Sequence, residues 1–231
     1  MEWGGLARRS FLSQVGVGMT TLFGATALAE PAAAQGQSAA GRFQAVRHAQ
    51  DDWLDKIPGR HRFVFDTTSP DAFGGSLLYS NNFFTANKDA YGLGDPDSAV
   101  VIVARHFATP FAYNETIWAK YGQAFGKMLN VNDPQTKEPP KINIYNSTAA
   151  VGSLPSLGTT LDTVLKRGVQ FAVCQMATRF IAGQLAQGGG NADAIYNELA
   201  ANLIANARLV PAGIVAVNRA QERGYTFAYV T

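Results

Sequence analysis

The chain contains one cysteine, Cys174, whose ionised thiol would be its strongest nucleophile. Cys174 follows the apolar run Val169–Val173 and precedes a segment with a helical pattern. If that run is a parallel strand, the thiol faces the unpaired N–H groups and the positive end of the next helix, which favour the thiolate. The alternative is that Cys174 is a small buried apolar side chain, because free cysteines are among the most buried residues.

The lack of a second cysteine limits the chemistry that Cys174 can perform. It excludes an internal disulfide and an internal resolving step. Any sulfur chemistry at Cys174 must therefore involve another molecule: a sulfur donor protein that loads the thiol, or an acceptor to which sulfur is passed.

Polar residues also follow the other predicted strands. The carboxyl ends of parallel strands form the ligand-binding edge of an α/β sheet. We therefore expect these polar residues at the same edge as Cys174. Arg105 offers a fork of donors that can hold an anionic sulfur species. His106 can act as a base or as a charge partner of the thiol. For both residues the alternative is a solvated or loop-stabilising role.

The sequence thus predicts that Cys174, His106 and Arg105 carry the chemistry. A second set is predicted to contact the ligand: Asp66, Thr67, Gln175, Pro211 and Gly213. Asp66 has an alternative role, as the cap of the helix that follows the first strand.

No metal or cofactor is expected. His61 begins its strand, and five residues at about 3.3 Å each place it roughly 16 Å from the edge that carries His106. A site built from His48, His61 and His106 is therefore awkward. Gly92-Leu93-Gly94 lacks the third glycine of a dinucleotide-binding turn, and the aromatic residues are expected in the core or at an interface.

The elements that position these residues alternate between strands and helices. Short apolar runs predict strands over 61–66, 99–104, 169–173, 207–210 and 225–230. The continuous β-branched run at 99–104 is typical of a strand covered on both faces of a parallel sheet. Helical patterns lie between the runs, including 115–129 and 161–167. This alternation predicts a single three-layer α/β domain, with about five mostly parallel strands flanked by helices.

The remaining segments divide the chain into three parts. Residues 35–60 are expected to form a linker and a short helix carrying Trp53, and residues 61–231 the α/β domain. Within that domain, 107–168 is an extended segment that we expect to act as a lid or subunit contact, because long irregular connections are often functional. The alternative is that it only adds packing. The net charge of +2 and the lack of a basic stripe argue against a nucleic-acid partner.

The amino terminus resembles an export signal. Arg8-Arg9 precedes a mild apolar stretch and the small residues Ala32-Ala33-Ala34, the three parts of a secretory signal. Paired arginines indicate the twin-arginine (Tat) pathway and its translocase as a partner. The apolar run is shorter than the roughly 20 residues that span a bilayer, so we expect cleavage after residue 34 and a periplasmic or otherwise exported protein without a membrane anchor.

Three segments of the closing third resemble the DsrE/DsrF-like sulfur-relay family: Gly168–Cys174, Arg208–Val215 and Gln221–Phe227. The resemblance implies a five-stranded parallel sheet flanked by helices, and a cysteine after a central strand that several members load as a persulfide. It also implies assembly into trimers or hexamers. Cys174 matches the family cysteine in position. The sequence therefore predicts a periplasmic DsrE-like thiol protein, a sulfur carrier or sulfurtransferase that uses Cys174 as a persulfide or mixed-disulfide carrier. The alternative is a non-enzymatic protein that binds a small ligand or serves as an oligomeric scaffold and whose cysteine is structural.

Overall fold

A five-stranded parallel sheet organises the chain, as the alternating pattern predicts. A computed structural model describes residues 44–149 and 155–231. The predicted signal over 1–34, and the linker up to residue 43, lie outside the described residues. The strands are β1 (His61–Thr67), β2 (Ser98–Ala104), β3 (Gln170–Cys174), β4 (Ala207–Val210) and β5 (Thr226–Val230). They lie in the order β4-β3-β2-β1-β5, and every neighbouring pair is parallel.

The register of the strands places the carboxyl ends of β1, β2 and β3 at nearly the same height in the sheet. Thr67 of β1 pairs with Ala104 of β2, which pairs in turn with Val173 of β3. Every residue of β2 is buried, as expected for a strand covered on both faces. The residues that follow β1, β2 and β3 therefore emerge together at one edge of the sheet.

Helices connect the strands. The α-helices are α1 (Trp53–Lys56), α2 (Pro70–Tyr91), α3 (Glu115–Leu129), α4 (Leu161–Lys166), α5 (Gln175–Ala186), α6 (Ala192–Ala201) and α7 (Gly213–Gln221). Short 3-10 helices are η1 (Ala49–Asp51), η2 (Asp95–Asp97), η3 (His106–Ala112) and η4 (Ile144–Asn146). None of the helices in the described ranges combines the length and the apolar character needed to cross a membrane.

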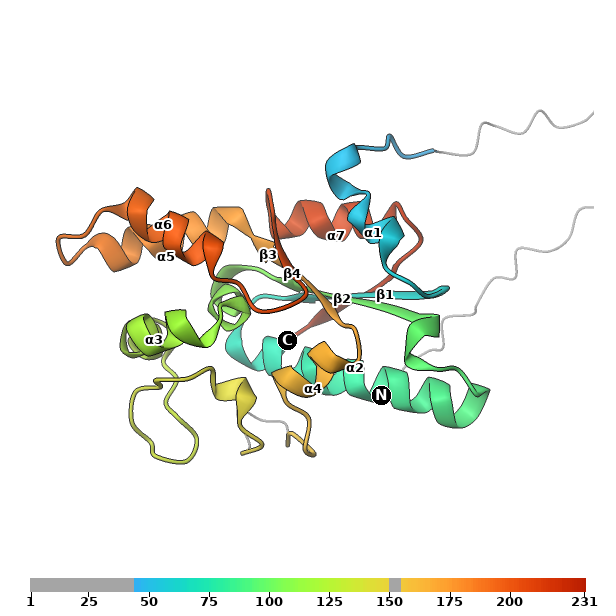
Figure 1. Cartoon of the computed structure of the whole chain (residues 1–231), viewed down its shortest axis with the longest axis horizontal. Coiled ribbons are helices and arrows are strands. Elements are labelled where there is room, and N and C mark those ends of the chain that lie inside the picture. The colour runs from blue at the N-terminus through green and yellow to red at the C-terminus, as the bar shows by residue number, and fades with distance from the viewer. Residues whose placement is uncertain (1–43, 150–154) are drawn as a thin grey trace, which may run out of the picture. The chain divides into compact units, whose positions relative to one another are not determined.

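Two apolar clusters cover the two faces of the sheet and complete the three-layer α/β fold. Figure 1 shows α1 and α7 on one face, and α2, α3 and α4 on the other. Alternate strand residues supply the two clusters: Val101 and Val103 pack with α1 and α7, whereas Val100 and Ile102 pack with the opposite layer. α5 and α6 pack together and continue past the carboxyl ends of the strands (Figure 1).

The first described segment is part of the fold and covers the sheet. Trp53 and Leu54 of α1 are buried in the cluster that contains α7. The hydroxyl of Tyr225 donates to the Leu54 carbonyl at 2.7 Å, and the guanidinium of Arg223, with no exposed surface, bonds Asp55 at 3.2 Å. The short helix carrying Trp53 that the sequence predicts corresponds to α1, and apolar side chains fix it against the sheet.

The described part of the extended segment at 107–168 also contributes packing. Phe111, Trp118 and Phe125 are fully buried, and Tyr145 is nearly so. Phe111 stacks on Trp118 with ring centroids 5.4 Å apart, and the Asn143 amide donates to the Phe111 carbonyl at 2.8 Å. These residues form one wall of the core, because their aromatic side chains need the sheet to bury them.

Candidate functional site

The carboxyl edge of the sheet holds a cavity of about 470 Å³. Its walls come from η3, from the first turns of α5 and α7, and from the ends of β2 and β3. The lining residues are Arg105, His106, Phe107, Cys174, Met176, Ala177, Phe180, Ala212, Gly213 and Ile214. The cavity thus brings together the three residues predicted to carry chemistry, Cys174, Arg105 and His106.

Cys174 lies at the turn from β3 into α5. It is the last residue of the strand and the N-cap of the helix, and its Sγ accepts a hydrogen bond from the Ala177 N–H at 3.4 Å. The residue is 6 % exposed, and its remaining surface faces the cavity. The sulfur therefore interacts with the helix N-terminus, which favours negative charge, and the residue that carries it lines the cavity.

A buried hydrogen-bonded chain braces this turn. The Tyr113 hydroxyl donates to Thr178 Oγ1 at 3.0 Å, and Thr178 Oγ1 donates to the Cys174 carbonyl at 3.0 Å. Both side chains are fully buried, and burial raises the pKa of Tyr113 well above its ordinary value of 10.0. The phenol therefore stays neutral and can keep donating, so η3 fixes the backbone from which the thiol projects.

Arg105 is held by Asp66, across the ends of two adjacent strands. Its Nε and Nη2 donate to the two carboxylate oxygens at 2.7 and 2.8 Å. The Asp66 side chain is only 3 % exposed and that of Arg105 is 19 % exposed. The hydrogen bond to Asp66 raises the pKa of Arg105, and the nearby Tyr229 and Cys174 contribute smaller shifts in the same direction. Asp66 thus orients the arginine, and it is Ser69 that caps α2 by accepting from Ala72 N–H at 3.1 Å.

Gly213 permits a close approach between α7 and Arg105. A Cβ at this position would lie 2.6 Å from Arg105 Cβ, 2.9 Å from Arg105 Cδ and 3.1 Å from Val103 Cγ1. Gly213 is the first residue of α7, and no side chain in the described part of the structure caps that helix. The first turn of α7 therefore lies against the aliphatic part of the Arg105 side chain.

His106 lies at the cavity rim in an uncommon backbone conformation. Its φ of 51° is in the left-handed region, which residues other than glycine seldom adopt. Backbone bonds on both sides hold this turn: Arg105 N–H donates to the Thr67 carbonyl at 3.2 Å, and Phe107 N–H to the Thr68 carbonyl at 3.1 Å. The turn directs His106 to the exposed side of the cavity.

Three of the predicted ligand contacts lie away from the cavity lining. Thr67 is fully buried, and its hydroxyl donates to the Val103 carbonyl at 2.8 Å. Gln175 donates to the Tyr196 hydroxyl of α6 at 2.8 Å. Pro211 is exposed beside the cavity without lining it. Of the predicted ligand set only Gly213 lines the cavity, and Asp66 supports it through Arg105.

The sequence reasoning missed the apolar walls. Phe107, Met176, Phe180 and Ile214 all line the cavity and are between 47 % and 68 % exposed. Met176 and Phe180 are one helical turn apart, so they share a face of α5. That spacing, on a helix that begins at the cysteine, is the signal that could have indicated an apolar wall.

The described residues contain no cluster of three or more potential metal-binding side chains. His61 is exposed at the first position of β1, the opposite end of the strand from the cavity. His48 is the residue before η1, in the segment that precedes β1. The three histidines therefore do not form one site.

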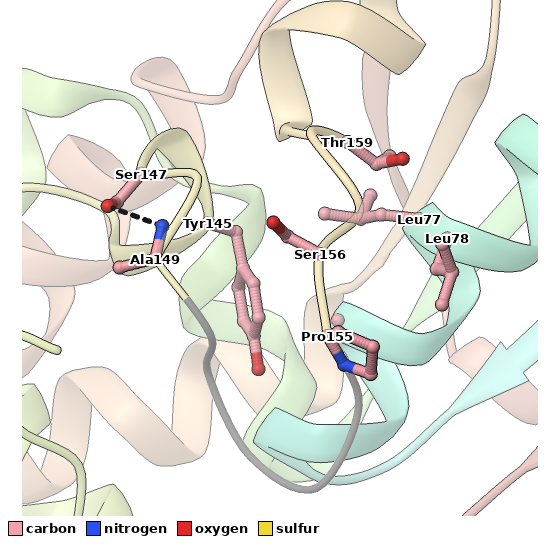
Figure 2. A pocket seen from close by; sticks show the side chains of 9 residues that line it. Leu77, Leu78, Tyr145, Ser147, Ala149, Pro155, Ser156 and Thr159 are labelled. Carbon is pink, nitrogen blue, oxygen red and sulfur yellow. Dashed lines mark hydrogen bonds between the residues drawn. The ribbon is translucent and has the colours of Figure 1, made fainter.

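A second cavity lies between α2 and the segment that contains η4 (Figure 2). Its volume is about 20 Å³, which accommodates about one water molecule. Figure 2 shows the Tyr145 ring between Ala149 and Ser156. Gly74 makes room for that ring, because a Cβ there would collide with it. This second cavity is too small for a substrate. We assign the candidate site to the cavity at the carboxyl edge because it brings Cys174, Arg105 and His106 together.

Comparisons with known proteins assign no family. No protein-family model matches the chain, and no curated protein matches it. A solved structure of a protein of unknown function, MTH1491 from Methanobacterium thermoautotrophicum, matches with 15 % identity and a TM-score of 0.37. The match covers 74 % of this chain and 99 % of that one.

Proposed function

We propose that this protein is a single-cysteine sulfur carrier, in which Cys174 holds sulfane sulfur as a persulfide. One observation supports this most strongly: the sole thiol of the chain lies in the wall of a 470 Å³ cavity, capping a helix N-terminus beside an arginine that is fixed by an ion pair. The resemblance of 168–231 to DsrE/DsrF-like proteins agrees with this reading.

The proposed transfer needs no oxidant. The Cys174 thiolate attacks the outer sulfur of a persulfide donor, a new S–S bond forms on Cys174, and the donor leaves as a thiolate. An acceptor thiolate then attacks the outer sulfur of the Cys174 persulfide and releases the Cys174 thiolate. Each step breaks one S–S bond and forms another, so electrons and charges balance.

Each neighbouring group has a defined part in this chemistry. The Ala177 N–H and the α5 N-terminus stabilise the negative sulfur, in the thiolate and in the persulfide. Arg105, whose direction is set by Asp66, supplies hydrogen-bond donors in the same cavity. His106, at the rim, can accept the thiol proton when the cavity is occupied.

A second function is favoured by the apolar character of the cavity. The Sγ of Cys174 fills the place that an N-cap oxygen takes in other helices, and four exposed apolar side chains surround the opening. A non-enzymatic protein that binds a small apolar ligand would need those walls and only a structural cysteine.

Thiol labelling and sulfur loading distinguish the two functions. The folded protein is treated near neutral pH with a small alkylating agent, and separately with a low-molecular-weight persulfide, and is then analysed by intact mass spectrometry. The carrier should take one alkyl group, and one sulfur atom that an added thiol removes. The Cys174→Ser variant, which keeps an N-cap oxygen, should take neither. A wild-type protein that fails both reactions while folded, but is alkylated once unfolded, would refute the carrier function.

We further propose that the protein is exported through the twin-arginine pathway and works as a homo-oligomer. The paired arginines Arg8 and Arg9 support export, and the family resemblance supports assembly. Replacing both arginines by lysine keeps the charge and should retain the protein in the cytoplasm with its signal uncleaved. Light scattering on the cleaved protein should give the mass of a trimer or hexamer. Unimpaired export of the double-lysine variant, or a monomeric mass, would contradict the respective proposal.

A further inference from the structure

The candidate cavity has two chemically different parts. Its outer walls are the exposed apolar side chains of Phe107, Met176, Phe180 and Ile214. The less exposed part of its lining includes Cys174 and Arg105. Exposed apolar side chains that gather around a concave site with a few polar groups are typical of small-molecule sites, where the apolar part binds and the polar part orients.

Arg105 keeps donors available for a ligand. Asp66 occupies Nε and one hydrogen of Nη2, and within residues 44–149 and 155–231 no acceptor bonds to Nη1. The remaining N–H donors, on Nη1 and Nη2, lie in one plane. They can therefore donate to two oxygens of the same oxyanion. None of the described lining residues carries a carboxylate, the group that would most strongly repel an anion.

Helix geometry adds to this preference for an anion. Gly213 brings the uncapped first turn of α7 against Arg105, and Cys174 begins α5 on the other side. The ion pair with Asp66 cancels the formal charge of Arg105, so the excess positive potential comes from the two helix N-termini. An anionic head group between Arg105 and Cys174 would leave the rest of the molecule against the apolar walls.

We propose that the cavity binds a small organic anion with an aromatic or branched aliphatic body, whose anionic head carries the sulfane sulfur. An organic thiosulfonate, R–SO₂–S⁻, has this chemistry. The Cys174 thiolate attacks the terminal sulfur, the S–S bond between that sulfur and the sulfonyl group breaks, and R–SO₂⁻ leaves as a sulfinate. Cys174 keeps the sulfur as a persulfide, and no oxidant is consumed. The sulfur-transfer part of this inference rests on the proposed carrier function, whereas the ligand class does not.

The ligand class can be tested without sulfur transfer. Calorimetry on the Cys174→Ser protein measures binding of benzenesulfonate and of methanesulfonate, which share a head group and differ in the apolar body. Benzenesulfonate should bind about tenfold more tightly, as expected for partial burial of one phenyl ring. Phe180→Ser should abolish most of that difference. Tyr91→Ser, which removes an exposed aromatic side chain outside the cavity, should leave it unchanged.

Loading with sulfur provides the second test. The rate of persulfide formation on Cys174 is measured with benzenethiosulfonate and with inorganic thiosulfate, each divided by its rate with a free small thiol to remove intrinsic reactivity. The normalised rate should be about tenfold higher for benzenethiosulfonate, and lower for Phe180→Ser but not for Tyr91→Ser.

The outcomes separate this inference from the proposed function. Equal binding of the two sulfonates, or equal normalised loading from the two donors, would refute the organic-anion class while the carrier function stands. Preferential binding of benzenesulfonate without loading from either donor would refute the carrier function, and with it the sulfur-transfer part of this inference, and would leave an anion-binding protein.

Discussion

Gly213 offers the sharpest test of the site geometry. Alanine usually stabilises a helix relative to glycine by about 0.5 to 1 kcal/mol. At position 213, however, the added methyl would lie 2.6 Å from Arg105 Cβ, an atom that moves only with its backbone, and 2.9 Å from Arg105 Cδ. Overpacking of this kind typically costs about 1 to 3 kcal/mol. We therefore expect Gly213→Ala to destabilise the protein by about 1 to 2 kcal/mol in net.

Gly183 is the matched control for this substitution. It lies within α5, and a Cβ there would meet no atom within 4 Å. Gly183→Ala should therefore stabilise the protein by about 0.5 to 1 kcal/mol. Urea unfolding followed by tryptophan fluorescence gives both free energies of unfolding, so the two alanine variants should differ in sign.

Gly213→Ala should also change the candidate site. To relieve the contact, α7 must move away from Arg105 or the arginine must leave its bidentate pair with Asp66. Either movement changes the environment of Cys174, so its alkylation rate should change in Gly213→Ala and stay at the wild-type value in Gly183→Ala. Suppose that Gly213→Ala is as stable as Gly183→Ala and is alkylated at the wild-type rate. That result would contradict the close contact between α7 and Arg105.

Three further predictions concern the supports of the site. Thr178→Val should lower the free energy of unfolding by about 1 to 3 kcal/mol, because the buried Tyr113 hydroxyl loses its acceptor, and adding Tyr113→Phe should recover part of the loss; full stability of the single variant in urea would contradict this. The hydrogen bond from Arg167 lowers the pKa of Asp95 below its ordinary 3.8, so this stabilisation is complete above that value and is lost as the pH falls through the lowered pKa. Asp95→Asn should therefore show a smaller loss of stability on acidification than wild type, as measured by unfolding at several pH values. Arg223→Met should destabilise the domain by about 1 to 3 kcal/mol and make the segment before β1 sensitive to proteolysis, since this buried arginine bonds that segment; unchanged proteolysis would show that the apolar contacts of α1 suffice.

The order of elements could be predicted from the sequence, because it depends on local patterns. The continuous β-branched run at 99–104 predicted β2, and the apolar run before Cys174 predicted β3 within one residue at each end. The placement of Cys174 at a strand-to-helix turn follows from those two neighbouring patterns. Alternation along the chain then indicated the parallel α/β sheet, because parallel strands need helical connections.

The tertiary structure alone decided how the site is assembled. Asp66 could have capped a helix or held an arginine, and the choice was set by the pairing of β1 with β2, which brings it to Arg105. Thr67 and Gln175 have the right residue types but bond to Val103 and Tyr196 instead. Local periodicity tells which residues reach the edge of the sheet. Which side chains meet there depends on register and on how closely helices approach, and those distances are set by packing between residues far apart in the chain.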